Sequence, residues 1–448
     1  MDTIADLSAK LSAGSVSSAA LIDEALARGL DPTGEGGRTF ISIDDRGARE
    51  AAATFDRLRR SEYRQGPLAG LPISVKDLFD VQGQATSAGS LVLKDAAPAA
   101  DDAPAIARLR AAGAVFIGRT NMTEFAYSGL GLNPHFGTPA NSYDRSSRRI
   151  PGGSSSGAAV SVADGMAVAG IGTDTGGSTR IPAALCGLVG FKPTQARIPL
   201  DGVVPLSPSL DSVGAIARSV GCCAVIDAVM AGDKAEPVEP VPADGLTLGV
   251  PSRFFLDDAD ETVSATFERA LDGLSRAEVR LVAIDLARFD ELAAVNAGGS
   301  LAALEAFAWH RQFREHWDLY DPRVLERILP GEKATAADYL DLMAARRDLV
   351  SWMDREIRDV DAVVCPTVPR VAPFISSLEN DNAVYRQVNR LMLRNTSVAN
   401  FFDLCAISIP CHAPGDAPVG LMLIGQRFRD RELFRAAASV ERIVTSAP

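Results

Sequence analysis

Short apolar runs alternate with amphipathic stretches along most of the chain. The runs at 71–77 and 114–120 have the length and composition of buried strands, and they flank a helix-like stretch at 101–114. This order is typical of two parallel strands joined by a crossover helix. We therefore predict an α/β fold with a mixed, largely parallel central sheet that helices cover on both faces.

The same order of elements resumes in the second half of the chain. The strands predicted there are 246–250, 279–286, 360–368, 405–411 and 419–425, and the helices are 262–276, 291–317 and 432–444. Because the closing strands are as apolar as the early ones, we expect them to join one sheet. The prediction is a single domain over 1–448.

Two further segments have a distinct composition. Residues 1–30 predict two short amphipathic helices separated at Ala13 and Gly14, with serines as caps of the second helix. Residues 231–245 contain three prolines and several charges, which predicts a linker-like surface segment.

Composition narrows the class of function. The formal net charge of −12 argues against a nucleic-acid-binding surface, which depends on clustered Lys and Arg. The N-terminal sequence has no signal-peptide pattern, and no unbroken apolar stretch of about 18 residues is present. We expect a cytoplasmic protein that binds neither nucleic acid directly nor a membrane.

The cysteines and histidines do not have the spacing of metal or redox sites. None of the six cysteines forms a C-x-x-C pair, and none of the four histidines has H-x-x-x-H or H-E-x-x-H spacing. We predict buried thiols and no metal site.

The segment from 151 to 194 contains two glycine- and serine-rich loops. Ser154 and Ser178 lie 24 residues apart, separated by a helix-like stretch at 155–164 and a strand-like run at 166–172. The helix would rise ~15 Å and the strand would return ~16 Å. Both serines should therefore meet at one edge of the sheet.

The second loop has the composition of an anion-binding turn. Backbone N–H groups of Thr175, Gly176, Gly177 and Ser178 can converge there and stabilise negative charge on a carbonyl oxygen. A phosphate is the alternative ligand, because 172–179 has the glycine spacing of a P-loop. That loop requires Lys where this chain has Ser178, so the nucleotide interpretation is less favoured.

Lys76 is the candidate base for a serine nucleophile, because no histidine is suitably placed. It follows the run Ile73-Ser74-Val75, which predicts a position at the end of a buried strand. Burial lowers the pKa of a lysine and so makes it a general base. The alternative for any single lysine is a surface charge.

These residues lie in four blocks that resemble the amidase signature enzymes. The blocks are "GPLAGLPISVKDLFD", "GRTNMTEFA", "PGGSSSGAAVSVADG" and "GTDTGGSTRIPAALCGLVGFKPT". The family includes bacterial amidases and the catalytic subunit of the glutamyl-tRNA amidotransferase. The resemblance implies the amidase signature fold, with its signature core at 60–220.

The resemblance also implies a Ser-Ser-Lys mechanism without a cofactor. Ser178 would be the nucleophile that forms an acyl-enzyme, and Ser154, after a cis peptide bond, would relay the proton between Ser178 and neutral Lys76. Ser155 would hydrogen-bond within this relay. The N–H groups of Thr175, Gly176, Gly177 and Ser178 would form the oxyanion hole.

The resemblance implies supporting roles for three more residues. Asp174 and Arg180 flank the nucleophile and are expected to form a structural ion pair or a clamp on the loop. Tyr127, in "FAYSG", lies where relatives line the acyl pocket, so we expect it to contact substrate; a core aromatic is the alternative.

We therefore predict a serine amidase that hydrolyses a carboxamide, anilide or carbamate-like bond of a small molecule, as a homodimer. The alternative is the catalytic subunit of a tRNA-dependent amidotransferase. A third hypothesis, a cysteine nucleophile at Cys186, is disfavoured because that residue lies among apolar neighbours in the sequence.

Overall fold

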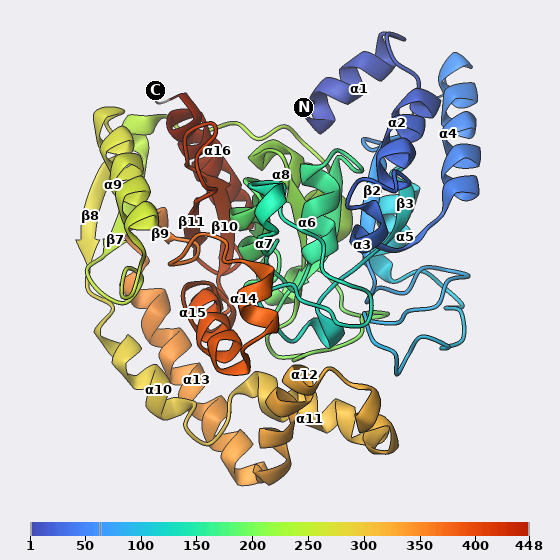
Figure 1. The fold of residues 1–448 in the computed structure, drawn as a ribbon. Helices are drawn as coiled ribbons and strands as arrows, with labels where there is room; N and C mark the ends of the chain where they lie inside the picture. The colour runs from blue at the N-terminus through green and yellow to red at the C-terminus, as the bar shows by residue number, and fades with distance from the viewer. Residues whose placement is uncertain (1, 62, 64, 447–448) are drawn as a thin grey trace.

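A single twisted sheet runs through the molecule. The computed structural model describes residues 2–61, 63 and 65–446, and within them eleven strands pair in the order β1-β3-β2-β4-β6-β5-β10-β11-β9-β7-β8 (Figure 1). The strands are β1 (Phe40–Ile43), β2 (Pro72–Lys76), β3 (Val115–Thr120), β4 (Ala169–Asp174), β5 (Val189–Lys192), β6 (Ser212–Ala217), β7 (Thr247–Pro251), β8 (Arg280–Ile284), β9 (Ala362–Pro366), β10 (Cys405–Pro410) and β11 (Gly420–Gly425). Strands of both halves of the chain thus share one sheet.

The sheet is mixed, as expected, but its parallel part is smaller than we predicted. Parallel pairs occur in two groups, β3-β2-β4 and β9-β7-β8. The strands between these groups pair antiparallel. The reason is that β5 and β6, like β10 and β11, follow one another without a crossover helix, which parallel pairing requires.

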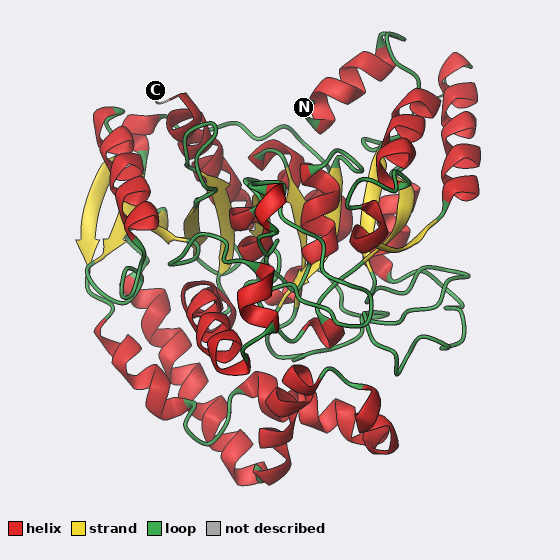
Figure 2. Cartoon of the chain, viewed as in Figure 1, coloured by secondary structure: helices red, strands yellow, loops and turns green. Residues whose placement is uncertain are grey.

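Helices pack on both faces of the sheet (Figure 2). Those on one face are α1 (Ile4–Ser12), α5 (Pro104–Ala111), α8 (Val220–Ala231), α9 (Glu261–Arg276) and α16 (Asp430–Ser446). Those on the other are α2 (Ser18–Gly29), α4 (Asp45–Arg60), α6 (Ser156–Ala163), α7 (Arg180–Leu185), α13 (Ala336–Glu356) and α15 (Asn382–Phe401).

The core follows from the two-residue period of the strands. In β11, Leu421 and Leu423 pack into the cluster beneath α16, whereas Met422 and Ile424 pack beneath α13 and α15. All four side chains are fully buried. Strands with two covered faces need continuous apolar runs, which explains the sequence pattern.

The shorter helices after residue 290 lie together with α13 and α15 in the lower part of the view in Figure 1. They are α10 (Leu292–Val295), α11 (Leu301–His310), α12 (Pro322–Ile328) and α14 (Ile375–Glu379). We predicted continuous helix over 291–317, but it is broken after α10. Gly299 has φ +125°, and the Ser300 side chain caps α11, so the chain restarts its helix there.

The two segments of distinct composition, 1–30 and 231–245, both pack against the rest of the fold. The described part of 1–30, which starts at residue 2, contains α1 and α2, and Ser17 caps α2 as predicted. The segment 231–245 runs over α16, where Ser439 Oγ donates to the carbonyl of Val241. None of the helices in the described residues is both long and apolar enough to cross a membrane.

Candidate active site

Lys76 ends β2 in a fully buried position, as predicted. Its Nζ donates to Ser154 Oγ at 2.7 Å and to Thr173 Oγ1 at 2.9 Å. Because β2 pairs parallel with β4, the ends of these two strands lie side by side. This pairing brings Lys76 to the loop that follows β4.

Burial decides the charge of Lys76. It lowers the pKa of the amine from 10.5 to about 7, against the opposing pull of the Asp174 and Asp211 carboxylates. A large fraction of Lys76 is therefore neutral near pH 7. Its nitrogen can accept a proton from a hydroxyl at hydrogen-bond distance.

Ser154 lies in the loop before α6, and its preceding peptide bond from Gly153 is cis, as the resemblance implied. Ser154 is fully buried, and its carbonyl accepts from Thr123 N at 3.1 Å. Ser155 joins this loop to the next one through its backbone, since its N–H donates to Ser178 O at 3.3 Å. The Ser155 hydroxyl contacts Thr173 O at 3.4 Å, which is a weak hydrogen bond outside the Lys76–Ser154 pair.

Asp174 and Arg180 form a fully buried ion pair that clamps the second loop. Arg180 binds both carboxylate oxygens, through Nε at 3.0 Å and Nη2 at 2.8 Å. Asn400 on α15 contacts both partners. The guanidinium of Arg180 holds the pKa of Asp174 well below its ordinary value. The two residues thus form the ion pair that the resemblance implied.

The clamp also fixes which N–H groups of the second loop are free. Asp174 Oδ1 accepts from Gly177 N at 2.8 Å, so that N–H is engaged. Within the described residues, the N–H groups of Thr175, Gly176 and Ser178 have no such partner. Of the four N–H groups predicted to bind an anion, only these three are thus free to do so.

Helix α15 holds the same loop from the opposite side. Thr396 Oγ1 donates to the carbonyl of Gly176 at 2.6 Å, and Asn400 Nδ2 donates to the carbonyl of Asp174 at 3.0 Å. These bonds hold the backbone of a loop whose residues Thr175, Gly176 and Ser178 line the nearby cavity. The loop is therefore preorganised by side chains more than 200 residues away in the sequence.

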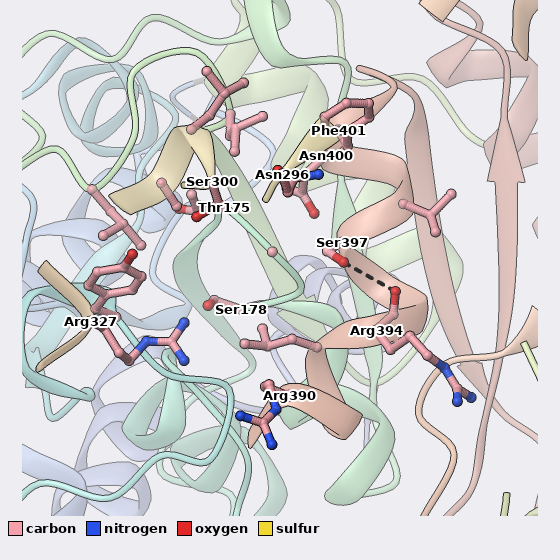
Figure 3. Close-up of a pocket in the computed structure, with 18 of the residues that line it drawn as sticks. Thr175, Ser178, Asn296, Ser300, Arg327, Arg390, Arg394, Ser397, Asn400 and Phe401 are labelled. Carbon is pink, nitrogen blue, oxygen red and sulfur yellow. Dashed lines mark hydrogen bonds between the residues drawn. The ribbon is translucent and has the colours of Figure 1, made fainter. Parts of the chain in front are cut away.

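A cavity of about 410 Å³ opens beside Ser178, which lines it together with Thr175 and Gly176 (Figure 3). In the described part of the chain, the Ser178 hydroxyl makes no hydrogen bond and is available to a bound molecule. Much of the wall is apolar and comes from Leu206, Leu210, Phe254, Leu292, Leu301, Leu393, Val398 and Phe401. A small molecule with an apolar portion fits this space.

Tyr127 also lines this cavity, in the position that the resemblance implied for it. Its ring is almost completely buried, and the guanidinium of Arg327 lies 4.5 Å from the ring centroid. Burial raises the pKa of Tyr127, so its hydroxyl stays protonated at neutral pH.

Sequence reasoning missed the cavity residues that follow position 290. On α15, Arg390 is followed by further cavity-lining residues three, four, seven and eleven positions later, which places them on one face of the helix: Leu393, Arg394, Ser397 and Phe401. That period is visible in the sequence. Nothing in it shows that this face lies opposite Ser178.

The sequence is similar to those of known proteins along most of its length. The amidase family model matches residues 35–434. A 2-amino-5-chloromuconic acid deaminase of Comamonas testosteroni is 36% identical over 90% of this chain and 88% of its own length. A glutamyl-tRNA(Gln) amidotransferase subunit of Roseiflexus sp. strain RS-1 is 34% identical over 98% of this chain and 96% of its own.

Solved structures agree with the sequence relatives. A crystal structure of an amidase has a TM-score of 0.89 at 32% identity, over 98% of this chain and 99% of that one. The peptide amidase of Stenotrophomonas maltophilia has a TM-score of 0.82 at 27% identity, over 100% of this chain and 97% of that one.

Proposed function

The chain belongs to the amidase family and is a hydrolase of carbon–nitrogen bonds other than peptide bonds, and from this premise we propose a free-standing serine amidase with Ser178 as its nucleophile. Its substrate is a small carboxamide, or a related anilide or carbamate. The observation that carries the proposal is the buried Lys76 amine, 2.7 Å from Ser154 Oγ and beside the loop of Ser178.

In the proposed reaction, Ser178 Oγ attacks the carbonyl carbon while its proton passes through Ser154 to Lys76. The oxyanion is stabilised by the N–H groups of Thr175, Gly176 and Ser178. Lys76 returns the proton through Ser154 to the leaving nitrogen, the C–N bond breaks, and an ester on Ser178 remains. Water then attacks the ester carbonyl and gives its proton through Ser154 to Lys76. The proton returns to Ser178 Oγ as the ester bond breaks and the acid is released.

The proposed relay also requires a contact between Ser178 and Ser154 and a supporting role for Ser155. The contact between the Ser178 and Ser154 hydroxyls would form on rotation of the Ser178 side chain toward the first loop. Ser155 would support the relay through its backbone N–H, which already bonds Ser178 O. Tyr127 would contact the bound substrate from the cavity wall.

The test is release of ammonia or amine by the purified protein from aliphatic, aryl, dicarboxylic and carbamate substrates. We expect turnover in the wild type and none in Ser178→Ala. A serine-directed fluorophosphonate should label Ser178, as located by mass spectrometry of the digested protein. Labelling at another serine, or full turnover in Ser178→Ala, would contradict the mechanism.

The second candidate function is the catalytic role in a tRNA-dependent amidotransferase, which the match to the Roseiflexus protein over 98% of this chain favours. Ser178 would then release ammonia for a partner. If the isolated chain labels at Ser178 but hydrolyses no amide, and a partner protein co-purifies from its native source, this function replaces the first. Light scattering of the same sample tests the predicted homodimer. The cytoplasmic location stays a prediction.

A further inference from the structure

Two arginines in the cavity beside Ser178 have no carboxylate partner in the described part of the chain. They are Arg327 on α12 and Arg390 on α15. Figure 3 shows both guanidinium groups on the same side of the cavity as Ser178. Arg394 differs, because its side chain lies 3.6 Å from Asp258 and donates to the carbonyl of Phe255 at 3.3 Å.

Arg327 is held in place by its neighbours, but one of its hydrogen-bond donors has no acceptor among the described residues. The helix that carries it begins where the buried carboxylate of Glu124 accepts from Asp321 N at 2.7 Å. Its guanidinium lies against Tyr127, whereas its Nε is buried without a hydrogen-bond partner in the described residues. An orphaned buried donor is costly unless a ligand accepts its hydrogen bond.

Arg390 is presented by a helix that is fixed at the neighbouring residue. Asn389 Oδ1 accepts from Ser128 Oγ at 3.0 Å and from Gly129 N at 2.9 Å. These bonds tie α15 to the loop that carries Tyr127. The backbone of Arg390 is therefore anchored, and its exposed side chain lines the cavity below Ser178 in the view of Figure 3.

No aspartate or glutamate side chain is among the described residues that line this cavity. Two positive charges thus stand beside a largely apolar wall; Arg327 is half-buried, so water screens its attraction for an anion less than that of Arg390, which is exposed. Guanidinium groups match the two oxygens of a carboxylate in geometry as well as in charge. Arg327 and Arg390, which pair with no carboxylate of the described residues, therefore suit a carboxylate of the bound molecule.

We propose that the substrate of this enzyme carries a carboxylate, which Arg327 and Arg390 bind while the amide lies at Ser178 and an apolar segment contacts the leucine-rich wall. The substrate class is then an amide acid, such as a monoamide of a dicarboxylic acid or an N-acylated amino acid. This inference rests on the proposed amidase function of the same site.

The experiment compares isosteric substrates with and without the charge. Glutaramate against pentanamide places the carboxylate on the acyl side, and N-acetyl-β-alanine against N-propylacetamide places it on the amine side. The variants are Arg327→Met and Arg390→Met. Arg386→Met is the matched control, one turn earlier on α15, outside the cavity and paired with Glu326 at 3.2 Å.

We expect the wild type to prefer one charged substrate over its neutral analogue. Arg327→Met and Arg390→Met should each lower kcat/KM for that substrate about 10- to 100-fold, the effect of losing one charge-assisted hydrogen bond. The neutral analogue and the Arg386→Met control should change less than about threefold. Equal losses for charged and neutral substrates would overturn the inference, as would a wild type without preference for charge.

A binding measurement separates this inference from the proposed chemistry. Titration calorimetry of the Ser178→Ala protein with succinate, glutarate and adipate requires no turnover. We expect one of these dianions to bind, and to bind about tenfold or more weakly after either arginine substitution. If none binds, the carboxylate site is refuted even when amides are hydrolysed. If one binds and no amide is hydrolysed, the proposed amidase function is refuted and the carboxylate site is supported.

Discussion

Replacing Lys76 by Met removes the buried amine while keeping most of its volume, and we expect the variant to lose activity yet change stability in a pH-dependent way. Without the base, turnover should fall about 10²- to 10⁴-fold. In the wild type, the rate should decline as the pH falls below about 7, because protonated Lys76 cannot accept the proton. The variant should show no such decline.

The stability effect follows from the pKa of Lys76, which is about 7 in the folded protein against an ordinary value of 10.5. Below pH 7 both states carry the proton, and the folded state bears the full cost of a buried ammonium, about 5 kcal/mol. Between pH 7 and 10.5 only the unfolded chain is protonated. Wild-type stability therefore rises with pH across this window, and above 10.5 the cost is absent.

The Met variant lacks this titration, although it also loses the hydrogen bonds from Lys76 to Ser154 and Thr173, about 1 kcal/mol each. Those losses do not depend on pH. We therefore expect the free energy of unfolding of the variant, relative to wild type, to fall by about 2 kcal/mol between pH 7 and pH 9.

Urea unfolding followed by circular dichroism at these two pH values measures the difference directly. All other titrating groups are common to both proteins and cancel. A difference between variant and wild type that is the same at pH 7 and pH 9 would show that Lys76 keeps an ordinary pKa. It would then remain charged in the fold and could not act as the base.

Three further substitutions test the surroundings of the nucleophile. Gly177→Ala should destabilise the protein by several kcal/mol in urea unfolding, because a Cβ there would lie 2.1 Å from Thr396 Oγ1 at a φ of +131°; an unchanged midpoint would contradict the packing. Asp174→Asn should cost about 3–5 kcal/mol by leaving Arg180 buried without its counter-ion, and a stable, active variant would refute the clamp. Cys186→Ala should retain turnover, because burial raises the pKa of that thiol and keeps it protonated; loss of activity in a folded protein would revive the cysteine mechanism.

The sequence predicted the strands that are locally apolar. Residues 71–77 and 405–411 contain β2 and β10, and each stretch is short and carries isoleucine together with other apolar residues. It predicted no strand at β5, which is only four residues long, or at β6, in which glycine, serine and alanine are frequent. Those strands are specified by their antiparallel partners, β10 and β4, and such pairing lies outside any local window.

Spacing in the sequence also placed the two serine loops correctly with respect to each other. A helix and a returning strand of similar length bring their ends together, and Ser155 N does lie 3.3 Å from Ser178 O. The burial of Lys76 followed equally from the apolar residues before it. Both predictions needed only the geometry of regular elements.

What the sequence by itself determined is therefore the edge of the sheet that carries the proposed catalytic residues Lys76, Ser154 and Ser178, all of which come from the first half of the chain. Only the tertiary structure decided what surrounds that edge. Helices α12 and α15 bring Arg327, Arg390 and Asn400 to it from more than 140 residues away. Their helical period marks a face but not the surface that it meets, because that surface is chosen by the packing of the whole core.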